Sequence, residues 1–224
     1  MKTPLLFDLD GTITDPAPGF LASMDYALEK MGEPLRPHEE LTPFIGPPLR
    51  GSFEILLGDS DPVRCEAALE HYRDRLNDGG KFEATIYPGM IDLLASLTDD
   101  YRLFIATGKP RGVAREIATH FGFDHFFEEI YGAELDGRFG DKAELIAHFS
   151  EIHDLPKGHG AMIGDTTFDM RAGRLNHLDC LGVTWGYGTD EQLRESGAGE
   201  LVSSSGELRA AIRKRYPTAA FPDS

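Results

Sequence analysis

The sequence predicts an α/β fold in which helices cover both faces of a mostly parallel sheet and an α-helical cap is inserted after the first strand. The first observation is that short apolar runs alternate with segments of helical periodicity from residue 83 onward, a pattern typical of strands joined by crossover helices. The second is that the stretch from about residue 16 to residue 82 contains helical patterns only. At 224 residues, the chain is long enough for one α/β core with a modest second lobe.

The first element is the short apolar run from Pro4 to Leu9, which ends in Asp-Gly-Thr and predicts a buried strand leading into a turn. Asp15 and Pro16 then indicate the start of a helix. Four apolar residues recur at helical spacing and define the buried face of this helix. They are Phe20, Met24, Leu28 and Met31.

Two more helices are expected in the insertion, one from Pro47-Pro48 and one after Asp61-Pro62, since proline favours the first turn of a helix. A glycine-rich turn at residues 78–80 ends the helical block. The domains expected from these patterns are a helical cap at 16–82, an α/β core formed by 1–15 and 83–216, and a loose tail at 217–224.

After the insertion, strands and helices are expected to alternate. Strands are expected at 101–106, 127–133, 161–164 and 178–185 and near residue 201. Helices are expected at 88–97, 113–121, 145–152, 168–176 and 208–216. Because strands joined through helices run parallel and are covered on both faces, the core is predicted to be Rossmann-like.

The charge of the chain argues against nucleic acid and anionic membranes as partners. Lys and Arg total 22 against 38 Asp and Glu, which gives a formal net charge of −16, and polyanions repel such a surface. No apolar stretch approaches the roughly 18 residues of a membrane span, and the N-terminal apolar run is too short for a signal peptide. With two distant cysteines and no CxxC pair, we expect a cytoplasmic protein; the sequence does not indicate its oligomeric state.

Polar residues follow several of the predicted strands, at the points where these strands end. The first strand ends in Asp8 and Asp10, and the strand at 161–164 ends in Asp165, with Asp169 four residues later. The other candidates are Thr107, Gly108 and Lys109 after the second core strand, and Lys142 at the start of the helix after the third. Because ligands bind at the carboxyl ends of parallel strands, these residues are expected to converge on one site.

This combination of residues supports phosphoryl transfer. A carboxylate can attack phosphorus and form an acyl phosphate, and a second carboxyl can protonate the departing oxygen and then activate water. Asp8 and Asp10 are two residues apart, so one of them can be the nucleophile and the other the acid/base. Clustered carboxylates repel each other and need a cation, and Mg²⁺ commonly binds one or two carboxylates together with phosphate oxygens. Thr107 and nearby backbone N–H groups are expected to hold the phosphoryl oxygens, and a lysine to neutralise the developing charge.

Four motifs carry a resemblance to a known family. They are DLDGT at 8–12, ATGKP at 106–110, DKAELI at 141–146 and IGDTTFD at 163–169. In this order they resemble the haloacid dehalogenase-like superfamily of hydrolases, over nearly the whole chain. The resemblance implies that Asp8 is the nucleophile, Asp10 the general acid/base and Thr107 a phosphate ligand. It also implies Mg²⁺ held by Asp8, Asp165 and the backbone carbonyl of Asp10, with Asp169 supporting the metal site or orienting the lysine, and it makes the helical insertion similar to the family's small cap.

Two lysines compete for the charge-neutralising role. Family position favours Lys142, because it follows the third core strand, whereas Lys109 is next to the phosphate-binding candidates Thr107 and Gly108. In the cap, Arg50 follows Gly-Pro-Pro at an expected helix N-terminus and is a candidate substrate contact. The alternative for Arg50 is a solvated side chain on a proline-initiated helix.

The resemblance implies a phosphatase that acts on a small phosphorylated metabolite through an aspartyl phosphate. Asp10 favours phosphate esters, since dehalogenase members of the superfamily lack the second aspartate. The chain resembles the phosphoglycolate phosphatase-like branch, while FIGPPLRGSF at 44–53 and IYGAELDG at 130–137 resemble members described as 5′-nucleotidases. Two alternatives stay open: a sugar phosphomutase of the same superfamily and a non-catalytic phosphoacceptor module. Trp-Gly-Tyr-Gly at 185–188 is expected to be a strand end and turn.

Overall fold

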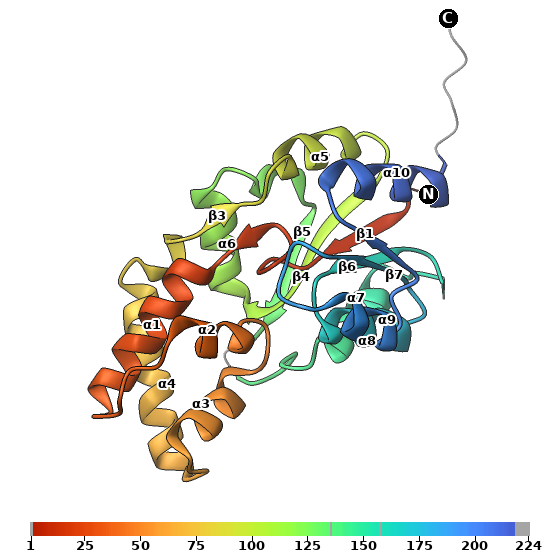
Figure 1. Cartoon of the computed structure of the whole chain (residues 1–224). Coiled ribbons are helices and arrows are strands. Elements are labelled where there is room, and N and C mark those ends of the chain that lie inside the picture. The colour runs from red at the N-terminus through yellow and green to blue at the C-terminus, as the bar shows by residue number, and fades with distance from the viewer. Residues whose placement is uncertain (1, 135, 157, 218–224) are drawn as a thin grey trace, which may run out of the picture. The chain divides into compact units, whose positions relative to one another are not determined.

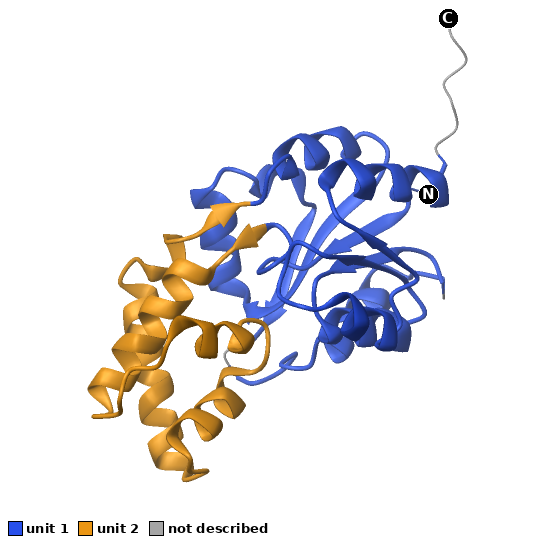
Figure 2. Ribbon diagram, in the orientation of Figure 1, with its two compact units in different colours: residues 1–13, 87–224 blue, residues 14–86 orange. Residues whose placement is uncertain are grey.

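The computed structural model describes residues 2–134, 136–156 and 158–217 and divides into two compact units (Figure 2). Residues 1–13 and 87–224 form the first unit, and residues 14–86 form the second. The second unit is one continuous insertion that begins shortly after the first strand. The predicted loose tail at 217–224 lies outside the described residues, apart from Pro217.

The first unit is built on a six-stranded sheet. In chain order its strands are β1 (Pro4–Phe7), β4 (Arg102–Pro110), β5 (Glu129–Ala133), β6 (Ala161–Gly164), β7 (Asp179–Val183) and β8 (Glu200–Val202). Their order in the sheet is β5-β4-β1-β6-β7-β8, and all neighbouring pairs are parallel. The predicted fold class is confirmed, and the sheet has the strand order of Rossmann-like domains.

Helices cover both faces of this sheet (Figure 1). On one side lie α5 (Met90–Leu97) and α10 (Ser205–Arg215), and on the other lie α7 (Lys142–Ile152), α8 (Thr167–Leu175) and α9 (Asp190–Glu195). The helix α6 (Arg111–His120) and the 3-10 turn η3 (Asp124–Phe126) lead from β4 to β5. The chain order of the strands reverses between β1 and β6, and ligands of open α/β sheets bind at the carboxyl ends of the strands at such a point.

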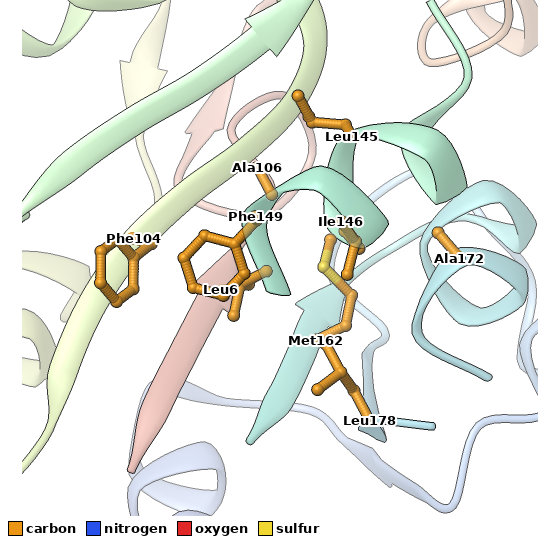
Figure 3. Close-up of a cluster of buried hydrophobic side chains, with 9 residues drawn as sticks. All are labelled: Leu6, Phe104, Ala106, Leu145, Ile146, Phe149, Met162, Ala172 and Leu178. Atoms are coloured by element: carbon orange, nitrogen blue, oxygen red, sulfur yellow. The ribbon is translucent and has the colours of Figure 1, made fainter. Parts of the chain in front are cut away.

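A hydrophobic cluster fixes the strands on either side of this point against two helices. Leu6 of β1 lies opposite Phe104 of β4 and Met162 of β6, so these three side chains point to the same face. Figure 3 shows them meeting side chains of α7 and α8, including Phe149, whose ring centroid is 4.8 Å from that of Phe104. Each large side chain buried in this way contributes about 1.5–3 kcal/mol. The cluster therefore holds the ends of β1 and β6 and the start of α7 in defined places.

The second unit is helical, with a small two-stranded sheet at its two ends. There β2 (Thr14–Asp15) pairs antiparallel with β3 (Thr85–Ile86). Between them lie α1 (Ala17–Lys30), α2 (His38–Leu41), η1 (Thr42–Phe44), α3 (Leu49–Leu57), α4 (Pro62–Asn77) and η2 (Gly80–Phe82). Tyr72 of α4 packs edge to face on Phe20 of α1 and Phe53 of α3, with centroid distances of 5.8 and 6.3 Å. Every helix among the described residues is too short or too polar to cross a lipid bilayer.

Three details of the first unit differ from the expected elements. The strand β4 continues to Pro110, past the expected end at residue 106, and its pairing with β5 is irregular after Ala106. The strand β7 spans Asp179–Val183 and is shorter than the expected strand at 178–185. The helix α9 was not among the expected helices, because its six residues are too few to show a helical period in the sequence.

Candidate active site

The carboxyl end of β1 places Asp8 in a buried position. Its backbone N–H donates to the carbonyl of Ile163 at 2.8 Å, which continues the pairing of β1 with β6 by one residue. Its Oδ1 accepts a hydrogen bond from the N–H of Leu9 at 2.8 Å and lies 2.9 Å from Nζ of Lys142. The carboxylate is therefore oriented by two donors, and the residue is 6% exposed.

Lys142 is the first residue of α7, a helix whose N-terminus is capped by the carboxylate of Asp141. Its ammonium contacts Oδ1 of Asp8 and Oδ1 of Asp169. Burial alone would lower the pKa of Lys142, but the negative charges of Asp169 and Asp8 outweigh burial and raise this pKa above its usual value. Lys142 therefore keeps its positive charge at neutral pH.

Asp169 lies in the first turn of α8 and is fully buried. Its Oδ2 accepts hydrogen bonds from the N–H and the hydroxyl of Thr166 at 2.9 and 2.7 Å, and its Oδ1 accepts from Lys142. Since both carboxylate oxygens have protein donors, Asp169 is held in place as the partner of Lys142.

Asp165 follows β6 and is also fully buried. Its Oδ1 accepts from the hydroxyl of Thr12 at 3.0 Å, and its Oδ2 accepts from the N–H of Tyr187 at 2.9 Å. The backbone at Gly11 passes so close that a Cβ there would lie 2.1 Å from Oδ2 of Asp165, and the φ of Gly11 is +81°. The turn after β1 therefore needs glycine at this position, both for its conformation and for space.

The three buried aspartates form one cluster that lacks a full set of counter-charges. One carboxylate oxygen from each of Asp8, Asp165 and Asp169 lies within 4.8 Å of the others. Lys142 contributes one positive charge, so three ionised carboxylates leave two negative charges. Burial and repulsion from Asp169 raise the pKa of Asp8 to about 7, and burial with the charges of Asp169 and Asp8 raises the pKa of Asp165. An excess of two charges and an all-oxygen donor set fit a hard divalent cation.

A further ion pair of this region joins Lys109 to Asp10, with Nζ 2.9 Å from Oδ2. The other oxygen of Asp10, Oδ1, is buried and has no hydrogen-bond partner among the described residues. Thr107 is buried, and its hydroxyl oxygen accepts from the N–H of Lys109 at 3.2 Å, while Gly108 is exposed. The structure thus gives each lysine a different partner: Lys142 contacts Asp8, and Lys109 contacts Asp10.

Arg50 belongs to the second unit and occupies the second position of α3. Its half-exposed side chain lies 3.7 Å from Glu54 and 3.6 Å from Glu66. Its contact with substrate stays a prediction.

Two contacts of Asp165 come from residues that have no role in the sequence-based hypothesis, Thr12 and Tyr187. Thr12 is part of the DLDGT motif, and Tyr187 follows β7 in a glycine-rich stretch. Thr12 and Tyr187 therefore both follow the carboxyl end of a strand. The same position in the fold identified the candidate site residues in the sequence.

Fold and motifs together indicate a hydrolase whose core is a Rossmann-like α/β sheet. The family model of the haloacid dehalogenase-like hydrolases matches residues 5–183, so the chain belongs to this family, as its motifs predict.

Similar proteins agree with this assignment. A 5′-nucleotidase of Pseudomonas aeruginosa is 41% identical over 191 residues, which cover 85% of this chain and 86% of that protein. The tyrosine-protein kinase PtkA of Mycobacterium tuberculosis is 33% identical over 213 residues, which cover 93% and 72%. A phosphoglycolate phosphatase of Psychrobacter arcticus is 26% identical over 226 residues, which cover 96% and 98%. The crystal structure of a predicted phosphatase from Clostridium acetobutylicum matches with a TM-score of 0.89 and 35% identity, over 96% of this chain and 99% of that chain. The prediction of a phosphatase with relatives in both named branches is confirmed.

Proposed function

We propose that the protein is a Mg²⁺-dependent phosphomonoesterase that hydrolyses a small phosphorylated metabolite through an aspartyl phosphate formed on Asp8. The observation that carries this proposal is the 2.9 Å ion pair between Asp8 and Lys142. A buried and oriented carboxylate beside a positive charge suits a nucleophile that must accept a dianionic phosphoryl group. The Oδ1 atom of Asp10 is buried and has no hydrogen-bond partner among the described residues. A carboxyl in this state suits proton transfer to the leaving-group oxygen and from water.

The proposed reaction has two steps. In the first, a carboxylate oxygen of Asp8 attacks phosphorus, the ester P–O bond breaks, and Asp10 gives a proton to the departing oxygen. In the second, Asp10 takes a proton from water, the oxygen of this water attacks phosphorus, and the bond between phosphorus and Asp8 breaks. Inorganic phosphate leaves, Asp10 is again protonated, and Asp8 is again a carboxylate. Lys142 stays beside Asp8 and offsets negative charge in both steps.

The proposed metal ligands are Asp8, Asp165 and the backbone carbonyl of Asp10. The two carboxylates belong to the buried acidic cluster. When bound there, Mg²⁺ would neutralise the carboxylates and polarise the phosphoryl oxygens. Asp169 accepts a hydrogen bond from the ammonium of Lys142, so its proposed role is to orient this lysine. The groups proposed to hold the phosphoryl oxygens are the Thr107 hydroxyl, the N–H groups around Gly108 and the Lys109 ammonium.

Nucleoside 5′-monophosphates are the first candidate substrates, because the relative named 5′-nucleotidase is 41% identical over 85% of this chain. Phosphoglycolate is the second candidate, on the basis of the relative named phosphoglycolate phosphatase. Residues 16–82 are proposed to act as the cap that selects the substrate, with Arg50 as a contact. Cys65 and Cys180 are free and buried, which suits the reducing cytoplasm that we propose as the location.

A phosphate-release screen tests this proposal. Nucleoside monophosphates, phosphoglycolate and sugar phosphates are compared with and without Mg²⁺, using the wild-type protein and Asp8→Asn. We expect Mg²⁺-dependent release by the wild type and no turnover by a folded Asp8→Asn variant, with circular dichroism as the control for folding. Appreciable turnover by Asp8→Asn would reject Asp8 as the nucleophile.

The same screen separates the two alternatives. Release of free phosphate from monoesters without a bisphosphate activator argues against a phosphomutase. An aspartyl phosphate that persists for minutes, without release of phosphate, favours a non-catalytic phosphoacceptor.

A further inference from the structure

The segment of residues 184–188, which follows β7, surrounds Asp165 on several sides. The N–H of Tyr187 donates to Oδ2 of Asp165 at 2.9 Å, and the N–H of Gly188 donates to the backbone carbonyl of Asp165 at 3.1 Å. A Cβ at residue 186 would lie 2.3 Å from the Asp165 side chain, and one at residue 188 would lie 2.2 Å from its carbonyl oxygen. Only glycine leaves room for Asp165 in its observed position.

Trp185 links this segment to the turn after β1. Its indole N–H donates to the backbone carbonyl of Thr12 at 3.1 Å, and the hydroxyl of Thr12 donates to Oδ1 of Asp165 at 3.0 Å. The ring of Trp185 also packs against Tyr87, whose N–H donates to the carbonyl of Ile13 at 3.0 Å. The turn that carries Asp10 is thus connected by hydrogen bonds to Asp165 and to the end of β7.

We infer that Trp185, Gly186 and Gly188 are positioning residues that set the spacing between the turn after β1 and Asp165, and thereby the affinity of the site for its divalent cation. This inference rests on the proposed function, in which Asp165 and the carbonyl of Asp10 hold that cation. One oxygen of the Asp165 carboxylate accepts from Thr12 in the turn after β1, and the other accepts from Tyr187 in the segment 184–188. These two hydrogen bonds orient the carboxylate. Loss of a group that orients a metal ligand typically weakens metal binding 10- to 100-fold.

The test is a calorimetric titration of Mg²⁺ into the metal-free protein. Trp185→Phe removes the indole donor and keeps an aromatic ring against Tyr87, and Gly186→Ala introduces the Cβ that meets Asp165. We expect Mg²⁺ to bind about tenfold more weakly to Trp185→Phe and at least tenfold more weakly to Gly186→Ala. The matched control is Gly112→Ala in α6, where an added Cβ has no neighbour within 4 Å and binding should be unchanged.

Fluorescence supplies a second readout, the response of the Trp185 emission to Mg²⁺. If Trp185 only stabilised the fold, Mg²⁺ would not change this emission. The chain has a single tryptophan, so its indole emission comes from Trp185 alone. Mg²⁺ should change this emission in the wild type, with the same midpoint as the calorimetric titration, and the change should be lost in Asp165→Asn. Thermal unfolding of every variant shows whether it is folded, and Trp185→Phe is the milder variant should Gly186→Ala fail to fold.

The outcomes separate this inference from the proposed function. If the wild type binds Mg²⁺ and releases phosphate, but Trp185→Phe binds Mg²⁺ as tightly as the control and the emission does not respond, the inference is overturned and the proposed function stands. If the wild type neither binds Mg²⁺ nor requires it for phosphate release, both are overturned.

Discussion

Replacement of Lys142 by methionine removes a buried positive charge while keeping an unbranched side chain. The ammonium lies 2.9 Å from Asp8, also contacts Asp169, and belongs to a residue that is 8% exposed. Removal of one partner from a buried ion pair costs about 3–5 kcal/mol, because the other partner is left as an uncompensated buried charge. Two carboxylates lose the same partner here, so we expect Lys142→Met to destabilise the metal-free protein by about this amount at pH 8.

The destabilisation should be smaller in acid. Burial and repulsion from Asp169 raise the pKa of Asp8 to about 7 even with Lys142 present, and Lys142 is one of the groups that lower it. In Lys142→Met the carboxyl of Asp8 therefore takes up a proton at a still higher pH. At pH 5.5 less negative charge is left uncompensated than at pH 8, and the difference in stability between variant and wild type should shrink.

Thermal unfolding in the presence of a chelator measures both effects. For a chain of this size, about 3 kcal/mol corresponds to a decrease of roughly 6–12 °C in Tm. The control is Lys214→Met, which removes an exposed charge on α10 and should change Tm by less than about 2 °C. Equal Tm values for Lys142→Met and Lys214→Met at pH 8 would refute the reasoning.

Between pH 5.5 and pH 8, ionisation of Asp8 should cost the metal-free wild type about 2 kcal/mol of unfolding free energy, because a carboxyl whose folded-state pKa is raised to about 7 stabilises the fold only while it is protonated. In thermal scans at several pH values, the Tm of Asp8→Asn should lack this decrease with pH, and Mg²⁺ should restore the wild-type Tm at pH 8. If Tm falls equally with pH in the wild type and in Asp8→Asn, the prediction is contradicted. Gly11→Ala should lower the unfolding free energy by about 1–3 kcal/mol, since it combines a φ of +81° with a Cβ 2.1 Å from Asp165, and urea unfolding should show no such loss for Gly112→Ala. Burial raises the pKa of Cys180 to about 11, so a thiol reagent at pH 8 should label it only when the protein unfolds, and rapid labelling of the native protein, mapped by mass spectrometry, would argue against its burial.

The strands of the core could be predicted from the sequence because buried parallel strands are continuous apolar runs. The run at 161–164 predicts β6 with the bounds that the structure has. The helix α7 begins at Lys142, directly after its Asp141 cap, and the sequence already predicted Lys142 at the start of a helix. Local pattern is sufficient in both cases, since neither element depends on a distant partner for its identity.

The partners of the charged residues could not be predicted in the same way. Sequence position left Lys109 and Lys142 as rivals, and only the folded structure pairs Lys142 with Asp8 and Lys109 with Asp10. The hydrogen bond from Thr12 to Asp165 joins residues 153 positions apart, which no local pattern encodes.

The role of Asp169 depends on geometry for a similar reason. Its spacing from Asp165 allows either metal binding or contact with a lysine. In the structure its Oδ1 accepts from Lys142, and its Oδ2 accepts from Thr166. The contact with Lys142 depends on how the start of α8 lies against the start of α7, which the residue types alone do not encode.

Transfer of a phosphoryl group to Asp8 is the central claim, and it can be tested by trapping that group. Asp10→Asn should still react with an aryl phosphate, whose leaving group needs no proton, but should be slow to hydrolyse the acyl phosphate. Acid quench after one turnover, followed by peptide mass analysis, should then find one phosphoryl group on Asp8 for each aryl alcohol released. Release of the aryl alcohol without any phosphoryl group on Asp8 would contradict the account.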